Sequence, residues 1–92
     1  MTSTKKWVVT FSKNANKNFG QLEKKLQKII MSFLEDRLLP AENPRLLGKQ
    51  LTGKLSPYWR YRVGDYRIVV DIRDHALIIL VIAIDHRRQV YK

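Results

Sequence analysis

The stretch YWRYRVGDYRIVVDIR, residues 58–73, decides the fold because it has the pattern of two strands joined by a tight turn. Aromatic or aliphatic side chains alternate with arginines over residues 58–63, and a largely apolar set alternates with a charged one over residues 66–73. Successive side chains of a strand point to opposite faces, and Gly64 followed by Asp65 is typical of a short hairpin turn. The stretch therefore predicts a hairpin with one apolar face and one face rich in arginine.

The arginines of this hairpin are predicted to share a face. Arg60 and Arg62 alternate with the apolar side chains of the first strand. Arg67 alternates with the apolar set of the second strand, which consists of Tyr66, Ile68, Val70 and Ile72. Antiparallel pairing across the turn brings Arg62 and Arg67 close together, and Arg87, after the last strand, can reach the same rim. We expect these arginines on the side of the sheet away from the helices.

The remaining elements follow from periodicity. Residues 6–11 alternate as a strand does. Apolar side chains recur at steps of three and four over residues 13–38, which indicates a helical stripe, and Gly20 divides it into two helices. Residues 76–84 are apolar on both faces and predict a central strand. We predict one α+β domain over residues 1–92, in which two antiparallel N-terminal helices pack on one face of a mainly antiparallel four-stranded sheet.

The charge balance points to an anionic partner. Eighteen lysines and arginines against eight acidic residues give a net charge of +10 on 92 residues, and such a field attracts nucleic acid or an acidic protein. Without cysteine, and with two histidines, the chain has no expected metal site. No signal peptide is evident, and the longest apolar run is far shorter than the roughly 20 residues that span a bilayer. We expect a cytoplasmic protein with no membrane attachment.

Two segments carry a resemblance to a known family. Residues 58–67 (YWRYRVGDYR) and residues 86–91 (HRRQVY) are similar to the RelE family of bacterial toxin–antitoxin modules, within the RelE/ParE superfamily, and the resemblance covers nearly the whole chain. It implies a metal-independent endoribonuclease that needs no cofactor, cuts mRNA in the ribosomal A site and is neutralised by a cognate antitoxin. The antitoxin is expected to be acidic and partly disordered, and to fold on binding.

The resemblance also implies roles for single residues. Arg60 and Arg62 fall where the family often has lysines, and Arg67 and Arg87 fall on arginines that hold the scissile phosphate while the 2′-hydroxyl attacks it. Tyr91 falls on the aromatic residue that orients the nucleotide. Further RNA contacts are predicted at basic residues of the loop 41–57 and of the C-terminal segment, namely Arg45, Lys49, Lys54 and Arg88.

The general base of this reaction stays open, because an arginine with a pKa above 12 is a poor base at neutral pH. The candidates are His86, which titrates in the useful range, Tyr91 and Lys54. Two other functions also stay open, inhibition of DNA gyrase as in ParE toxins and RNA binding without catalysis. In a third alternative the arginines are merely balanced by acidic neighbours, namely Asp65, Asp71, Asp74 and Asp85.

Overall fold

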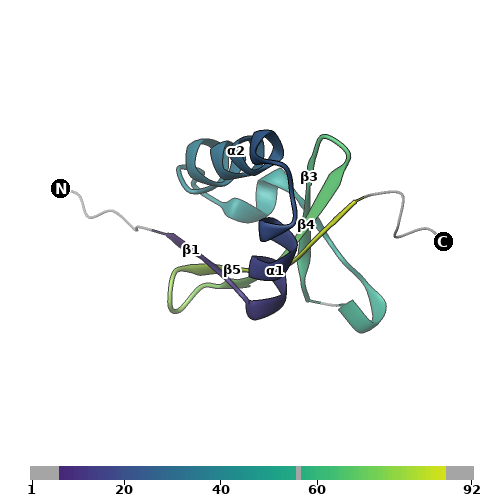
Figure 1. Ribbon diagram of the computed structural model, residues 1–92. Coiled ribbons are helices and arrows are strands. Elements are labelled where there is room, and N and C mark those ends of the chain that lie inside the picture. Colours follow the sequence, from purple (N-terminus) through teal and green to yellow (C-terminus); the bar gives the residue numbers. More distant parts are fainter. Residues whose placement is uncertain (1–6, 56, 87–92) are drawn as a thin grey trace.

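Helices cover one face of a sheet in the computed structural model, which describes residues 7–55 and 57–86 (Figure 1). In chain order the elements are β1 (Val8–Phe11), α1 (Lys13–Gly20), α2 (Lys24–Ser32), the π-helical turn η1 (Phe33–Leu38), the 3-10 turn η2 (Pro44–Leu47), β2 (Lys49–Gln50), the 3-10 turn η3 (Gly53–Leu55), β3 (Trp59–Val63), β4 (Tyr66–Arg73) and β5 (Ile78–His86). No helix in this described part of the chain is long and apolar enough to cross a membrane.

The sheet has the order β1-β5-β4-β3-β2, with β1 parallel to β5 and every other pair antiparallel. The predicted α+β fold and the interior position of the last strand are confirmed, but the sheet has five strands instead of four. The additional strand, β2, is only two residues long and lies in the predicted loop. Its residues show no apolar alternation, and it forms only because Lys49 pairs with Arg60 of β3.

The predicted division of the helical stripe at Gly20 is confirmed. Ser12 caps α1, since its Oγ accepts a hydrogen bond from the Ala15 amide at 3.0 Å. The core lies between the helices and one face of the sheet, where the fully buried side chains include Ala15, Ile30, Leu34 and Leu38 from the helical segment and Tyr61, Ile68, Val70, Ile79 and Val81 from the strands. Burial of this stripe fixes which face of the sheet stays uncovered by helices.

The second half of β5 departs from simple alternation. The register shifts between Val69 and Val70 of β4, which pair with Ala83 and Val81, so Ile82 has no partner on β4. Such a one-residue bulge moves every later side chain to the other face of the sheet. As a result Ile84 is buried on the helix side, and Asp85 lies on the opposite side.

Side chains of α1 satisfy the backbone of β5 at this bulge, beyond the point where β1 ends. Ser12 and Asn14 both donate to the Ile82 carbonyl, at 3.2 and 3.1 Å, and the Ile84 amide donates to Asn18 Oδ1 at 3.1 Å. Because β1 pairs only as far as Val81, these backbone groups would otherwise lack a partner. Helix α1 therefore holds the shifted register in place.

Candidate functional site

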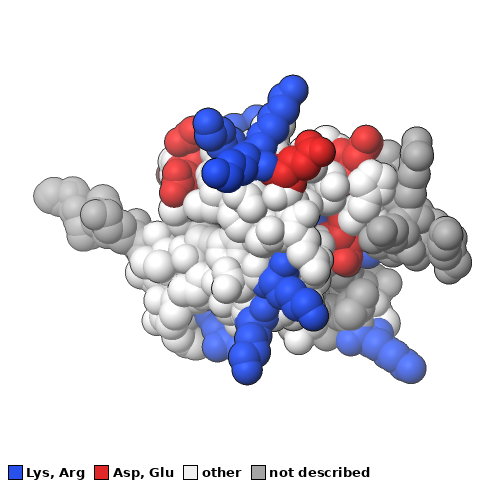
Figure 2. Space-filling view, viewed as in Figure 1, with Lys and Arg blue, Asp and Glu red and all other residues white. Residues whose placement is uncertain are grey.

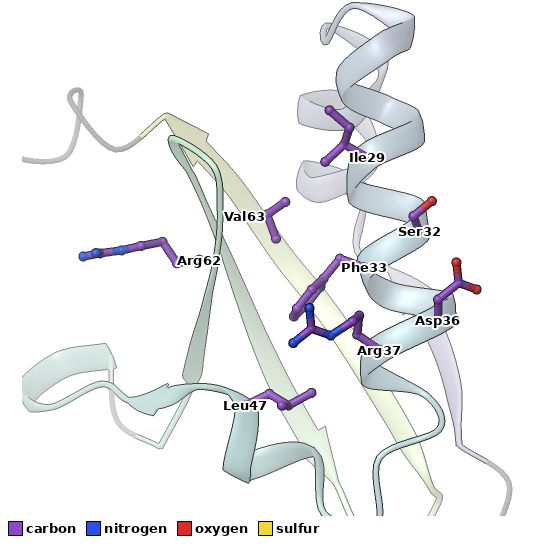
Figure 3. A pocket seen from close by; sticks show the side chains of 8 residues that line it. All are labelled: Ile29, Ser32, Phe33, Asp36, Arg37, Leu47, Arg62 and Val63. Carbon is purple, nitrogen blue, oxygen red and sulfur yellow. The ribbon is translucent and has the colours of Figure 1, made fainter.

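Three arginines lie together on the side of the sheet that faces away from the helices. Arg62 of β3 is directly opposite Arg67 of β4, and Arg60 lies between Val69 of β4 and Lys49 of β2. Figure 3 shows the Arg62 side chain directed away from α2 and η1, whereas Val63 points toward them. We call Lys49, Arg60, Arg62 and Arg67 the arginine face. The structure thus brings together four of the residues predicted from the sequence.

Within the described residues, no ion pair involves a cation of the arginine face. The two ion pairs among the described residues join Arg45 to Asp74 and Arg73 to Asp71. Neither pair involves Arg60, Arg62 or Arg67. The Nε of Arg67 is buried and has no hydrogen-bond partner among the described residues. Buried donors usually find a partner, and like charges directly opposite each other destabilise a sheet. Two opposed guanidiniums and one unpartnered buried donor make the arginine face a candidate anion-binding surface.

A shallow cavity lies on this face. Its volume is about 220 Å³, and it is lined by Leu47, Gly48, Lys49, Arg60 and Arg62. At about 30 Å³ for one water in the liquid, this is room for several waters or for a phosphate group. Three of its lining side chains are cations on paired strands, so their spacing is set by the sheet.

The loop that supplies Lys49 is fixed to β3 by buried contacts. The Tyr61 hydroxyl, fully buried, donates a hydrogen bond of 2.6 Å to the Pro44 carbonyl. Burial raises the pKa of the Tyr61 phenol well above its usual range, so it remains a donor. Gly48 packs so closely that a Cβ there would lie 2.5 Å from the Arg60 carbonyl oxygen. Only glycine allows this approach, which sets the position of Lys49.

Arg45, predicted to bind RNA, lies elsewhere. Its guanidinium donates two hydrogen bonds to Asp74, at 3.0 and 2.7 Å, and lies 5.9 Å from the ring centroid of Trp59, a side chain on the helix side of the sheet. These hydrogen bonds lower the pKa of Asp74 and raise the pKa of Arg45. The pair ties the loop to the β4–β5 turn, and the structure does not bring Arg45 to the arginine face.

The other predicted site residues are distributed as follows. Lys54 lies in η3 and is exposed. His86 pairs with Tyr66, its ring centroid 5.0 Å away, on the side opposite the arginine face. Arg87, Arg88 and Tyr91 lie outside the described residues. Among the residues that the structure describes, no three His, Asp or Glu side chains are grouped to hold a metal ion.

From the sequence, Asp85 is predicted only as a possible counter-charge and not as a site residue. The β4–β5 register places it directly opposite Arg67, on the arginine face. Simple alternation along 76–84 and beyond would put His86 there instead. No local signal in the sequence marks the bulge at Ile82, so the exchange of these two neighbours follows only from the pairing in three dimensions.

A second and larger hollow lies on the helix side. Its volume is about 510 Å³, and Figure 3 shows it between the helical segment and β3, with Phe33 and Val63 pointing into it. Two apolar side chains at its border are open to solvent, Ile29 at 45% and Leu47 at 38%. Asp36 and Arg37 also line it, so both signs of charge are present. An apolar centre with polar edges is a composition typical of protein interfaces.

Comparisons with known proteins agree with this architecture. The family model described as the ParE toxin of the type II toxin–antitoxin system parDE matches residues 9–91. No curated protein sequence is significantly similar to the chain.

Solved structures show the same fold at low identity. The toxin–antitoxin complex RelBE2 from Mycobacterium tuberculosis is 24% identical over 89% of this chain and 99% of that chain, with a TM-score of 0.80. The isolated RelE toxin of E. coli is 17% identical over 87% and 83%, with a TM-score of 0.68. The YoeB–YefM complex from Staphylococcus aureus is 23% identical over 87% and 95%, with a TM-score of 0.67.

Proposed function

We propose that this chain, which belongs to the ParE toxin family of type II toxin–antitoxin systems, stops translation by cutting mRNA on the ribosome. The observation that carries the proposal is the pair Arg62 and Arg67, opposite each other on rigid strands, with a buried donor of Arg67 unpartnered in the described part of the chain. Guanidiniums carried by neighbouring residues of paired strands can bind the oxygens of one phosphate strongly.

The chemistry of RNA cleavage matches what these groups supply. The 2′-oxygen loses its proton and attacks phosphorus, negative charge builds on the phosphate oxygens, and the 5′-oxygen leaves. Fixed guanidiniums stabilise that developing charge without reorganising, so the proposed reaction draws on no metal ion. Arg62 and Arg67 hold the scissile phosphate, and Arg60 and Lys49 hold the neighbouring backbone. The contacts predicted for Arg87, Arg88, Tyr91 and Lys54 remain part of this proposal.

A cognate antitoxin is the proposed partner. The similar proteins from M. tuberculosis and S. aureus were solved as toxin–antitoxin complexes. An antitoxin with an apolar segment and acidic residues would suit both the apolar hollow beside Val63 and the net charge of +10. Its binding should weaken as salt rises, to the extent that exposed charges contribute.

The proposal is tested by inducing the protein in cells and mapping the 5′ ends of the mRNA. Cuts clustered at one position of in-frame codons, and absent when translation is blocked, are expected. Intact mRNA during growth arrest would contradict the nuclease, and retained RNA binding without cuts on purified translating ribosomes would indicate a binding module without catalysis.

One observation favours a second function, inhibition of DNA gyrase, because the matching family model is that of ParE toxins. The arginine face favours the nuclease instead, since a protein inhibitor of gyrase has no need of several guanidiniums on one face of the sheet that form no ion pair within the described residues. A supercoiling assay separates the two: inhibition of gyrase with mRNA intact would support the second function.

A further inference from the structure

A carboxylate stands at the end of a row of arginines. In the strand register Arg62 is directly opposite Arg67, and Arg67 is directly opposite Asp85. The three residues therefore lie side by side on β3, β4 and β5. Paired residues share a face, and strands are about 4.8 Å apart, which makes the row about 10 Å wide. Asp85 is half-buried, and neither ion pair in residues 7–55 and 57–86 involves it. The row thus combines two cations with one acceptor.

We propose that Asp85 is the general base that removes the proton from the 2′-hydroxyl, an inference that rests on the proposed RNA cleavage. A phosphate held by Arg62 and Arg67 lies one strand spacing from the Asp85 carboxylate. The 2′-hydroxyl of the same nucleotide is adjacent to that phosphorus, and a base acts within about 2.6–3.2 Å of the oxygen it deprotonates. The row therefore places phosphate and base in the order that the reaction requires.

The proposed step balances as follows. The carboxylate takes the 2′-hydroxyl proton, the 2′-oxygen forms a bond to phosphorus, and the bond from phosphorus to the 5′-oxygen breaks. The 5′-oxygen takes a proton from a water molecule, and the proton on Asp85 then neutralises the hydroxide left behind. The products are a 2′,3′-cyclic phosphate and a 5′-hydroxyl, with no net change in protons.

The neighbouring groups are less suited to this step. Guanidiniums do not lose a proton at neutral pH, and the side chain of His86 lies on the other side of the sheet. Lys49 is on the arginine face but in the adjacent row, opposite Arg60. An ammonium group must first lose a proton to act as a base, whereas a carboxylate accepts one directly.

The simpler alternative is that Asp85 only balances the charge of Arg67. The two roles predict opposite changes in the cleavage rate when the carboxylate is removed. Asp85→Asn removes a negative charge from a surface that binds RNA. If Asp85 only balances charge, the variant should bind RNA at least as tightly and cut at least as fast. If Asp85 is the base, binding should hold or tighten while cleavage falls by about 100-fold or more, the usual contribution of a general base.

The experiment measures single-turnover cleavage and ribosome binding for wild type, Asp85→Asn, Asp85→Glu and Asp71→Asn. Asp71→Asn is the matched control, because it removes the same charge from the same face, where its carboxylate accepts from Arg73 at 3.1 Å. We expect Asp71→Asn to cleave at about the wild-type rate, and Asp85→Glu, which keeps a carboxylate, to regain at least about tenfold over Asp85→Asn.

The outcomes separate the two proposals. Wild type that fails to cut mRNA overturns the proposed function, whatever Asp85 does. Wild type that cuts, together with Asp85→Asn at a rate within about threefold of it, overturns the role of Asp85 alone. Equal loss in Asp85→Asn and Asp85→Glu would also overturn it, since loss of local structure does not depend on the carboxylate; thermal melts of both variants show whether structure was lost.

Discussion

Strand β3 separates two surfaces of opposite character. Arg62 points to the arginine face, whose cations form no ion pair within the described residues, and Val63 points to an apolar hollow beside Phe33. The basic side chains over α2, by contrast, lie beside acidic ones (Figure 2). Adjacent residues of one strand thus contribute to surfaces of different composition. The arginine face would suit a polyanion, and the hollow beside Val63 would suit an apolar chain. The first two predictions each change one surface and measure both cleavage and antitoxin binding, and the last two test the contacts that hold the loop in place.

The largest effect is expected from Arg67→Ala. Loss of a preorganised donor to the transition state costs about 100- to 1,000-fold in rate, so mRNA cleavage on purified ribosomes should fall by that factor while antitoxin affinity changes little. Arg73→Ala is the control, because Arg73 lies on the same face of β4 but its guanidinium is paired with Asp71. If Arg67→Ala cut at the rate of Arg73→Ala, the arginine row would not be the site of phosphate binding.

The opposite result is expected from Ile29→Asp on the helix side. A charge at the border of the apolar hollow should weaken antitoxin binding about tenfold or more, which corresponds to about 1.4 kcal/mol, and leave cleavage unchanged. Leu46→Asp serves as the control, since Leu46 is 79% exposed and does not line the hollow. Titration of toxin with cognate antitoxin measures the effect; equal affinities for the two variants would place the antitoxin elsewhere.

The sequence allowed the arginine face to be predicted because alternation is a local property. Arg60, Arg62 and Arg67 belong to two strands joined by a two-residue turn, so their shared face follows from spacing alone. The position of Asp85 could not be predicted, since it depends on a bulge whose backbone groups bond to Asn14 and Asn18, more than sixty residues earlier. The same limit applies to Arg45, whose partner Asp74 is 29 residues away.

An effect on stability, and not directly on either surface, is expected from Tyr61→Phe. Removal of the hydroxyl leaves the Pro44 carbonyl without its buried hydrogen bond, which costs about 1–3 kcal/mol and loosens the loop that carries Lys49. Urea denaturation measures the loss. Tyr66→Phe is the control, because in the described part of the chain the Tyr66 hydroxyl makes no hydrogen bond. If Tyr66→Phe lowered the free energy of unfolding as much as Tyr61→Phe, the hydrogen bond to Pro44 would add nothing to stability.

The smallest effect concerns the exposed pair of Arg45 and Asp74, which ties the loop to the turn on the helix side. The hydrogen bonds from Arg45 lower the pKa of Asp74 in the folded protein, so the pair stabilises the fold above the unfolded pKa, about 3.9. That contribution is lost as the pH falls through the lower folded pKa. Asp74→Asn should therefore be slightly less stable than wild type near neutral pH and converge with it near pH 2, in urea denaturation at low salt. A difference in free energy of unfolding that stayed constant across this pH range would mean that the charge of Asp74 does not hold the loop. Convergence would show that this contact depends on pH, unlike the arginine face, whose guanidiniums keep their charge throughout the range.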